Sequence, residues 1–111
     1  MSKLTSDALV TAFAALGDPT RFAIVERLLD RGALPAGDLQ DVAEISAPAI
    51  SRHLKVLREA GLVTQTVDAQ RRIYAVTPAT VQAIHAWTMD HADFWNASLD
   101  RLAAALDAEE G

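Results

Sequence analysis

The side chains best suited to a chemical role lie in a helical segment that begins at Ser46. At 100° per residue, Arg52 and Lys55 fall on the side opposite an aliphatic stripe, beside a serine and several small residues. Arginine and lysine donate hydrogen bonds to phosphate oxygens and guanine edges, and small side chains let a helix enter a groove about 12 Å wide. The pattern therefore favours binding of a nucleic-acid duplex. The alternative is an ordinary amphipathic helix whose cations only aid solubility.

The distribution of charge also favours one anion-facing surface. The 111 residues carry a net charge of −5. Residues 46–77 contain five basic and two acidic side chains, a net charge of +3, and the remaining residues carry a net charge of −8. An acidic body with one basic segment is typical of a protein that meets a polyanion with one face. Chance clustering on a solvated face is the alternative.

Other chemistry has little support in the sequence. The absence of cysteine excludes disulfides, thiolate metal sites and thiol redox sensing. No nucleophile–base pair, phosphate-cradling glycine loop or suitably spaced carboxylate pair is present, so we do not expect an enzyme. Among the candidate metal ligands His85, Asp90, His91 and Asp93, the two histidines lie about 240° apart around a helix and cannot share one ion within a chain. We therefore predict no metal and no cofactor.

Length and composition fit one globular domain. Half of the residues are hydrophobic and 23% are charged. The chain has no run of eighteen apolar residues, so we expect no membrane span. The first residues lack the apolar core of a signal peptide, so we expect a cytoplasmic protein.

Capping residues and prolines mark the expected secondary structure. Asp18-Pro19 and Thr77-Pro78 are typical helix starts, and Gly61 followed by Leu62 predicts a Schellman ending. Alternating β-branched residues on either side of Asp68-Ala69-Gln70 predict a β-hairpin. The expected elements are helices over about 6–16, 19–31, 35–44, 46–61 and 78–108, with strands over 62–67 and 71–76 between the last two helices.

This order, ααααββα, is that of a winged helix-turn-helix domain: mainly α, with a β-hairpin wing. The stripe formed by Ile50, Leu54 and Leu57 would hold the fourth helix against the core. Arg71 and Arg72 begin the returning strand, where a wing reaches the flanking backbone or minor groove of DNA. Ser46 and the free amides at the helix start can bind a phosphate.

Three stretches resemble ArsR-type winged-helix repressors: Gly17–Arg21, Ser46–Val63 and Arg71–Tyr74, within a resemblance that covers about residues 8–77. The resemblance implies a cytoplasmic homodimer that binds an inverted-repeat operator and represses transcription, commonly of its own operon. By matching positions, it places DNA contacts in 46–55 and 68–72; for His53 a packing or phosphate role is expected. The residues predicted to face DNA are Ser46, Ala47, Pro48, Ala49, Ser51, Arg52, His53, Lys55, Gln70, Arg71 and Arg72.

The sequence departs from the family pattern at four positions. Ala47 stands where the family often has a polar residue, Pro35 where it usually has serine or threonine, and Glu44 where it usually has glycine. Ala69 occupies the wing turn, where glycine is usual. These differences bear on sequence preference and wing geometry.

The last helix contains three of the six aromatic residues. A domain this small cannot cover so long an apolar helix by itself, so we expect the first and last helices to form an isologous homodimer. The chain is interpreted as a single domain, 1–111, with a DNA-binding core and wing over 6–77 and a dimerisation helix over 78–108. The predicted interface residues are Leu9, Phe13, Leu16, Val81, Ile84, Trp87, Trp95, Leu99, Leu102 and Leu106.

The ending of the chain resembles a subgroup of the family without an evident metal site. Ala83 stands two residues before His85, where metal-sensing relatives have aspartate. The expected function is therefore sequence-specific, autoregulatory repression without metal sensing. Two alternatives stay open: a repressor of the same fold that responds to a metal or an unidentified small-molecule effector, and an interaction module that docks a partner protein on the last helix.

Overall fold

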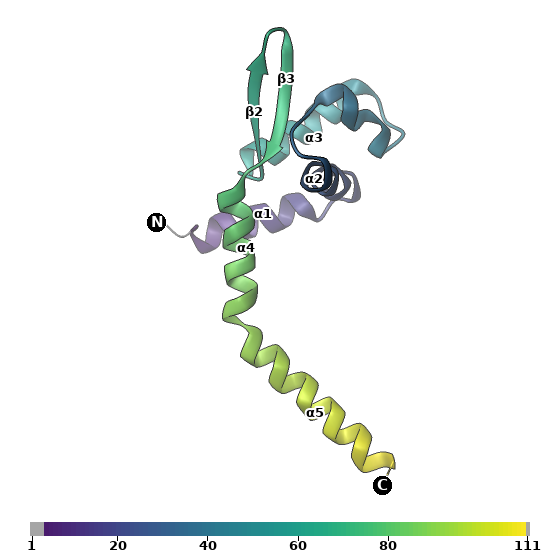
Figure 1. Cartoon of the computed structure of the whole chain (residues 1–111), viewed down its shortest axis with the longest axis vertical. Helices are drawn as coiled ribbons and strands as arrows, with labels where there is room; N and C mark the ends of the chain where they lie inside the picture. Colours follow the sequence, from purple (N-terminus) through teal and green to yellow (C-terminus); the bar gives the residue numbers. More distant parts are fainter. Residues whose placement is uncertain (1–3, 111) are drawn as a thin grey trace.

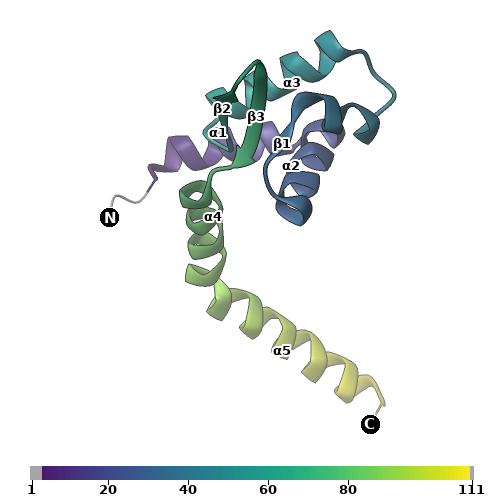
Figure 2. The same cartoon turned by 45° about the horizontal axis from the view of Figure 1, so that its top comes forward.

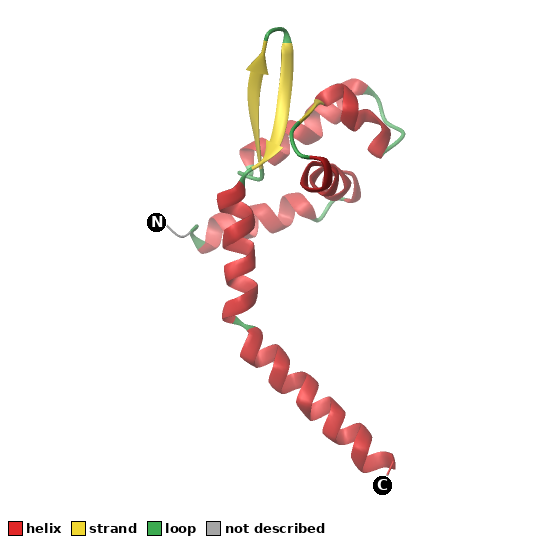
Figure 3. Cartoon of the chain, in the orientation of Figure 1, coloured by secondary structure: helices red, strands yellow, loops and turns green. Residues whose placement is uncertain are grey.

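The computed structural model describes residues 4–110. It shows a helical body, a projecting hairpin and a C-terminal arm formed by the helices after residue 77 (Figure 1). The predicted fold class, mainly α with a β-hairpin wing, is confirmed (Figure 3). The elements are α1 (Ser6–Leu16), α2 (Pro19–Arg31), β1 (Leu34–Pro35), the 3-10 helix η1 (Ala36–Val42), α3 (Ala47–Glu59), β2 (Val63–Asp68), β3 (Arg71–Val76), α4 (Pro78–Asp90) and α5 (Ala92–Glu110).

The predicted helix ends are confirmed around α2 and α3. The Asp18 carboxylate accepts hydrogen bonds from the backbone N–H groups of Thr20 and Arg21, at 2.9 and 3.0 Å, and so caps α2. At the end of α3, the N–H of Leu62 donates to the carbonyl of Leu57 at 3.0 Å, which completes the Schellman motif. Gly61 adopts a φ of 76°, which glycine alone takes without strain.

One hydrophobic core joins α1, α2, η1, α3 and the base of the hairpin. The predicted stripe of α3 lies inside it, since Ile50, Leu54 and Leu57 are each at most 1% exposed. Ile24 of α2 and Leu39 of η1 are fully buried in the same cluster. The inner face of α3 is therefore fixed by close packing, which leaves the opposite face for solvent or a ligand.

A third strand, which the sequence pattern does not predict, enlarges the wing sheet. Leu34 pairs with Tyr74, and Pro35 with Ile73, so the antiparallel order is β1-β3-β2. Two residues are too few to produce an alternating pattern, and proline, which lacks an N–H, is tolerated on an edge strand. The expected third helix is consequently shorter: η1 begins after this strand and is a 3-10 helix rather than an α-helix.

The expected single C-terminal helix is divided in two. His91 interrupts it with φ −109° and ψ 10°, and its N–H donates to the carbonyl of Thr88 at 3.2 Å. Its ring nitrogen Nδ1 lies 2.7 Å from the carbonyl oxygen of Trp87. The prediction of an uninterrupted helix was wrong because no glycine or proline marks this break.

The two C-terminal helices run away from the body (Figure 2). The radius of gyration is 18.4 Å, whereas a compact chain of this length has about 13 Å. Within residues 4–110 no single helix is both long and apolar enough to cross a membrane; only the bent pair α1 and α2, taken together, reaches that length and composition.

The wing turn holds an alanine in a conformation that favours glycine. Ala69 has a φ of 58°, the left-handed region in which a Cβ atom clashes with the following carbonyl. We expect Ala69→Gly to raise the free energy of unfolding by about 0.5–1 kcal/mol, measured by urea denaturation. Gln70→Gly is the matched control, because residue 70 has no positive φ and glycine there should destabilise the turn. Equal effects of both variants would contradict the assignment of strain to residue 69.

Candidate nucleic-acid interface

The outward face of α3 contains the two predicted cations. Arg52 and Lys55 are exposed, on the side away from the buried stripe. Ser46, Ala47, Pro48 and Ser51 are exposed beside them, and Ala49 is half-buried. The Ser46 hydroxyl accepts a hydrogen bond from the N–H of Ala49 at 3.3 Å and so caps the helix. The first three turns of α3 and its cap therefore present small residues, two hydroxyls and two positive charges to solvent.

The hairpin carries the second group of predicted residues. Arg71 pairs with Asp68 and Arg72 with Val67, next to the turn, and Gln70, Arg71 and Arg72 are exposed. Figure 1 shows the hairpin projecting beyond the helical body. Neither arginine forms an ion pair with another residue in the range 4–110. The tip can therefore present two cations to a polyanion.

Another arginine ties α3 to the hairpin. Arg58, in the last turn of α3, donates a hydrogen bond to the side-chain oxygen of Gln65 on β2. The hydroxyl of Tyr74 on β3 lies 3.5 Å from the same oxygen. These contacts connect the C-terminal end of α3 to the base of the wing.

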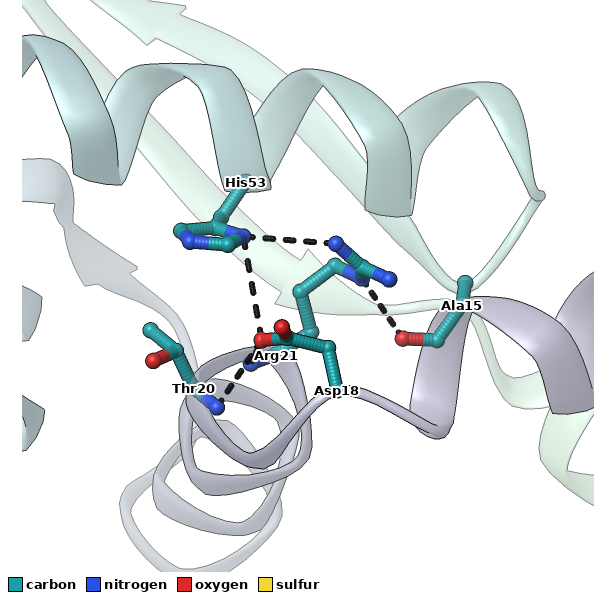
Figure 4. Close-up of polar contacts among 5 residues, drawn as sticks. All are labelled: Ala15, Asp18, Thr20, Arg21 and His53. Carbon is teal, nitrogen blue, oxygen red and sulfur yellow. Dashed lines mark hydrogen bonds and ion pairs between the residues drawn. The ribbon is translucent and has the colours of Figure 1, made fainter.

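His53 points into the protein, to the start of α2 (Figure 4). Its Nδ1 lies 3.4 Å from Nη1 of Arg21 and 3.9 Å from Oδ2 of Asp18. Arg21 also donates from Nε to the carbonyl oxygen of Ala15, in the last turn of α1, at 2.7 Å. His53 thus occupies a packing position, and a DNA contact from it stays a prediction. No sequence pattern indicates a contact between Arg21 and His53, because only the folded chain brings residues 21 and 53 together.

Asp18 is held in its ionised form by these contacts. The backbone N–H of Arg21, followed by the charge of its guanidinium, lowers the pKa of the Asp18 carboxyl from its usual 3.8. On η1, a hydrogen bond from Arg27 lowers the pKa of Asp41 in the same direction. Both carboxylates connect α2 to neighbouring segments.

We expect the protein to lose stability as the pH falls through the lowered pKa of Asp18. Because the pKa is lower in the folded state, the stabilisation is fully present above 3.8 and disappears as the folded carboxylate is protonated. Asp18→Asn keeps an oxygen that accepts the two amide bonds but does not titrate. Urea unfolding between about pH 5 and about pH 2.5 should show a smaller loss for the variant than for the wild type. Equal losses would assign the acid sensitivity to other groups.

The predicted dimer residues fall into two groups. Leu16 and Ile84 pack against the core of their own chain, and Leu9 and Val81 are half-buried. Phe13 of α1 meets Trp87 of α4 edge to face, with ring centroids 5.5 Å apart, and both remain partly exposed. The remaining four, on α5, are all more than half exposed: Trp95, Leu99, Leu102 and Leu106.

The histidines of the arm are not part of a metal cluster in the described part of the chain. His85 is exposed on α4, and His91 packs on Trp87 with ring centroids 4.9 Å apart. No group of three or more His, Asp and Glu side chains within residues 4–110 is close enough to hold an ion. The absence of a metal site stays a prediction.

Comparison with known proteins gives consistent matches. Residues 16–66 match a helix-turn-helix domain family. The chain is 41% identical over 98 residues to the HTH-type transcriptional regulator Rv2034 of Mycobacterium tuberculosis, covering 88% of each chain. It is 33% identical to the arsenical resistance operon repressor of Escherichia coli, covering 87% of this chain and 80% of the repressor. It superimposes on the crystal structure of the ArsR family transcriptional regulator RHA00566 with a TM-score of 0.72 and 25% identity, covering 86% of this chain and 97% of the other.

Proposed function

The chain belongs to the ArsR family of winged helix-turn-helix transcriptional regulators, and we propose that it binds an inverted-repeat operator as a homodimer and represses transcription there. The relatives reported above include a regulator and a repressor. Operator binding requires the protein to share the compartment of the DNA, which agrees with the cytoplasmic location expected from the sequence.

In the proposed complex α3 enters the major groove. Arg52 donates hydrogen bonds to a base edge or a phosphate, and Lys55 neutralises a phosphate. Ser46 and the N–H of Ala47 lie at the positive end of the helix dipole, where a phosphate is stabilised. Pro48 has no N–H, and the N–H of Ala49 already donates to the Ser46 hydroxyl. Arg71 and Arg72 bring the wing to the flanking backbone. In a homodimer the two copies of α3 would meet half-sites about 34–36 Å apart.

One observation carries this proposal: α3 is buried along one side and cationic along the other. Ile50, Leu54 and Leu57 fix the helix in the core, while Arg52 and Lys55 remain exposed. A helix held in this way can present its outer side chains to a groove without losing its own packing.

Footprinting on the promoter of the protein's own gene tests two things together: operator binding, and the expectation that the protein represses its own transcription. We expect a protected inverted repeat, with an affinity for that duplex that falls steeply with salt as counterions are released. Binding no tighter than to random DNA at physiological salt would overturn the proposal and favour docking of a partner protein on α5. Addition of a chelator should leave the affinity unchanged, and a tenfold change would favour a metal-responsive regulator.

Arg52→Ala should weaken operator binding by about 1–3 kcal/mol if Arg52 contacts a base. The loss should be concentrated at one base pair, because the variant can no longer discriminate there. Fluorescence anisotropy with operators substituted one pair at a time measures this. An equal loss on every sequence would assign Arg52 to a phosphate. Arg101→Ala on α5 is the matched control and should bind as the wild type does, because Arg101 lies outside the proposed DNA interface and about 130° around α5 from its apolar face.

A further inference from the structure

Arg21 makes polar contacts with two other segments at the point where α1 and α2 meet α3. Its Nε donates to the carbonyl of Ala15 in the last turn of α1, and its Nη1 lies 3.4 Å from Nδ1 of His53 on α3. Its own N–H donates to the Asp18 carboxylate, which restrains the first turn of α2. Figure 4 shows these side chains converging between the helices. The arginine therefore joins the helix predicted to form the dimer to the helix predicted to contact DNA.

The contact with His53 is placed where it can set the rotation of α3. Close packing of the aliphatic stripe holds α3 in the core, and a directional polar contact beside the stripe adds a further restraint on the rotation of the helix about its own axis. His53 lies between the buried stripe and the outward face, 100° from Arg52. A polar contact there restrains rotation, and a recognition helix needs its side chains within about 0.5 Å and 10–20° of the productive geometry.

The packing between α1 and α3 is incomplete on one side of their contact. A groove of about 280 Å³ lies between them, bordered by small side chains of α1 and by Val56 and Ala60 of α3. Arg21 forms one wall of this groove. Beside this groove, Arg21 links the two helices directly through its contacts with Ala15 of α1 and His53 of α3.

We propose that Arg21 and His53 are positioning residues for DNA recognition, which hold α3 at a fixed rotation relative to the end of α1. This proposal rests on the proposed operator binding. Arginine only donates hydrogen bonds, so the contact requires His53 to be neutral, with Nδ1 as acceptor and the proton on Nε2. Any side chain that places a hydrogen-bond acceptor at the Nδ1 position should then keep the contact with Arg21, whereas an apolar side chain of similar size should lose it.

A double-mutant cycle tests the positioning role. His53→Leu removes the acceptor, and Arg21→Lys keeps the charge but loses the forked geometry. Each single variant should bind the footprinted operator about 3- to 30-fold more weakly. The double variant should bind no more weakly than the weaker single variant, because both changes break the same contact between residues 21 and 53 and only Arg21→Lys also alters the bond to Ala15. Affinity for a scrambled duplex should change less than about twofold, since the phosphate-facing cations are intact.

His53→Asn separates positioning from folding. The asparagine oxygen takes the place of Nδ1, so this variant should recover most of the operator affinity that His53→Leu loses. Urea unfolding at one protein concentration checks that each variant is folded under the binding conditions. Arg31→Lys, the same substitution at the far end of α2, is the matched control and should bind normally.

The outcomes distinguish the two proposals. Suppose that the wild type prefers its operator to the scrambled duplex. Additive losses of operator affinity in the cycle, or no recovery of affinity with His53→Asn, would then overturn the positioning role alone. A wild type that binds operator and scrambled duplex equally would overturn operator recognition and the positioning role with it. Non-additive losses confined to the operator, with recovery by asparagine, would establish the role.

Discussion

Trp95→Asp is expected to convert the proposed dimer to a monomer and to lower the affinity for the proposed operator by at least about 100-fold. Trp95, Leu99, Leu102 and Leu106 are spaced by four, three and four residues, so they form one face of α5. All four are 53–63% exposed, and α5 contributes no buried residue to the core. A carboxylate within such a face would have to be desolvated on association, at a cost of several kcal/mol.

Sedimentation velocity and operator titration of the same samples test this prediction. Without the dimer the two copies of α3 bind their half-sites independently. Binding at one half-site then no longer raises the effective concentration of α3 at the other. Ala97→Asp is the matched control: it adds the same charge to α5, about 190° around the helix from the apolar face. An unchanged sedimentation coefficient for Trp95→Asp would place the interface elsewhere. A monomeric wild type would contradict the proposed dimer itself.

Leu54→Ala is expected to cost about 2–5 kcal/mol of unfolding free energy. Leu54 is 1% exposed and lies in the centre of the stripe that fixes α3. Its truncation removes buried apolar surface and leaves a cavity between α3 and the rest of the core. Domains of this size are stable by only about 5–15 kcal/mol, so the loss is a large part of the total.

Urea denaturation at a single protein concentration measures this loss, because dissociation of a dimer makes stability depend on concentration. Val56→Ala, two residues further along α3, is the control: Val56 is 39% exposed and its truncation should cost less than about 1 kcal/mol. Similar losses for both variants would mean that the stripe does not anchor α3.

The helices of the body could be predicted from the sequence because their ends have local causes. Asp18 caps α2 with its own side chain, and Gly61 ends α3 by taking a backbone conformation that other residues avoid. The burial of Ile50, Leu54 and Leu57 follows from helical spacing alone. These features depend on residues close together in the chain.

The features that sequence analysis missed depend on distant partners or lack a local signal. β1 exists because Leu34 and Pro35 find β3 about forty residues later. The break at His91 has no glycine or proline to mark it. The position of His53 beside Arg21 follows from the packing of α3 on α2, which no pattern within either helix determines.

If the protein binds DNA as proposed, its unequal distribution of charge acts before the two molecules touch. The net positive charge lies on α3 and the hairpin, while residues 78–110 carry six acidic and one basic side chain. Near a duplex, attraction at one end and repulsion at the other exert a torque that rotates the tumbling molecule, within a screening distance of about 8 Å at physiological ionic strength. Collisions in which the acidic arm leads are brief, and those in which α3 leads last longer. Raising the salt concentration should therefore slow productive association as well as weaken the final complex.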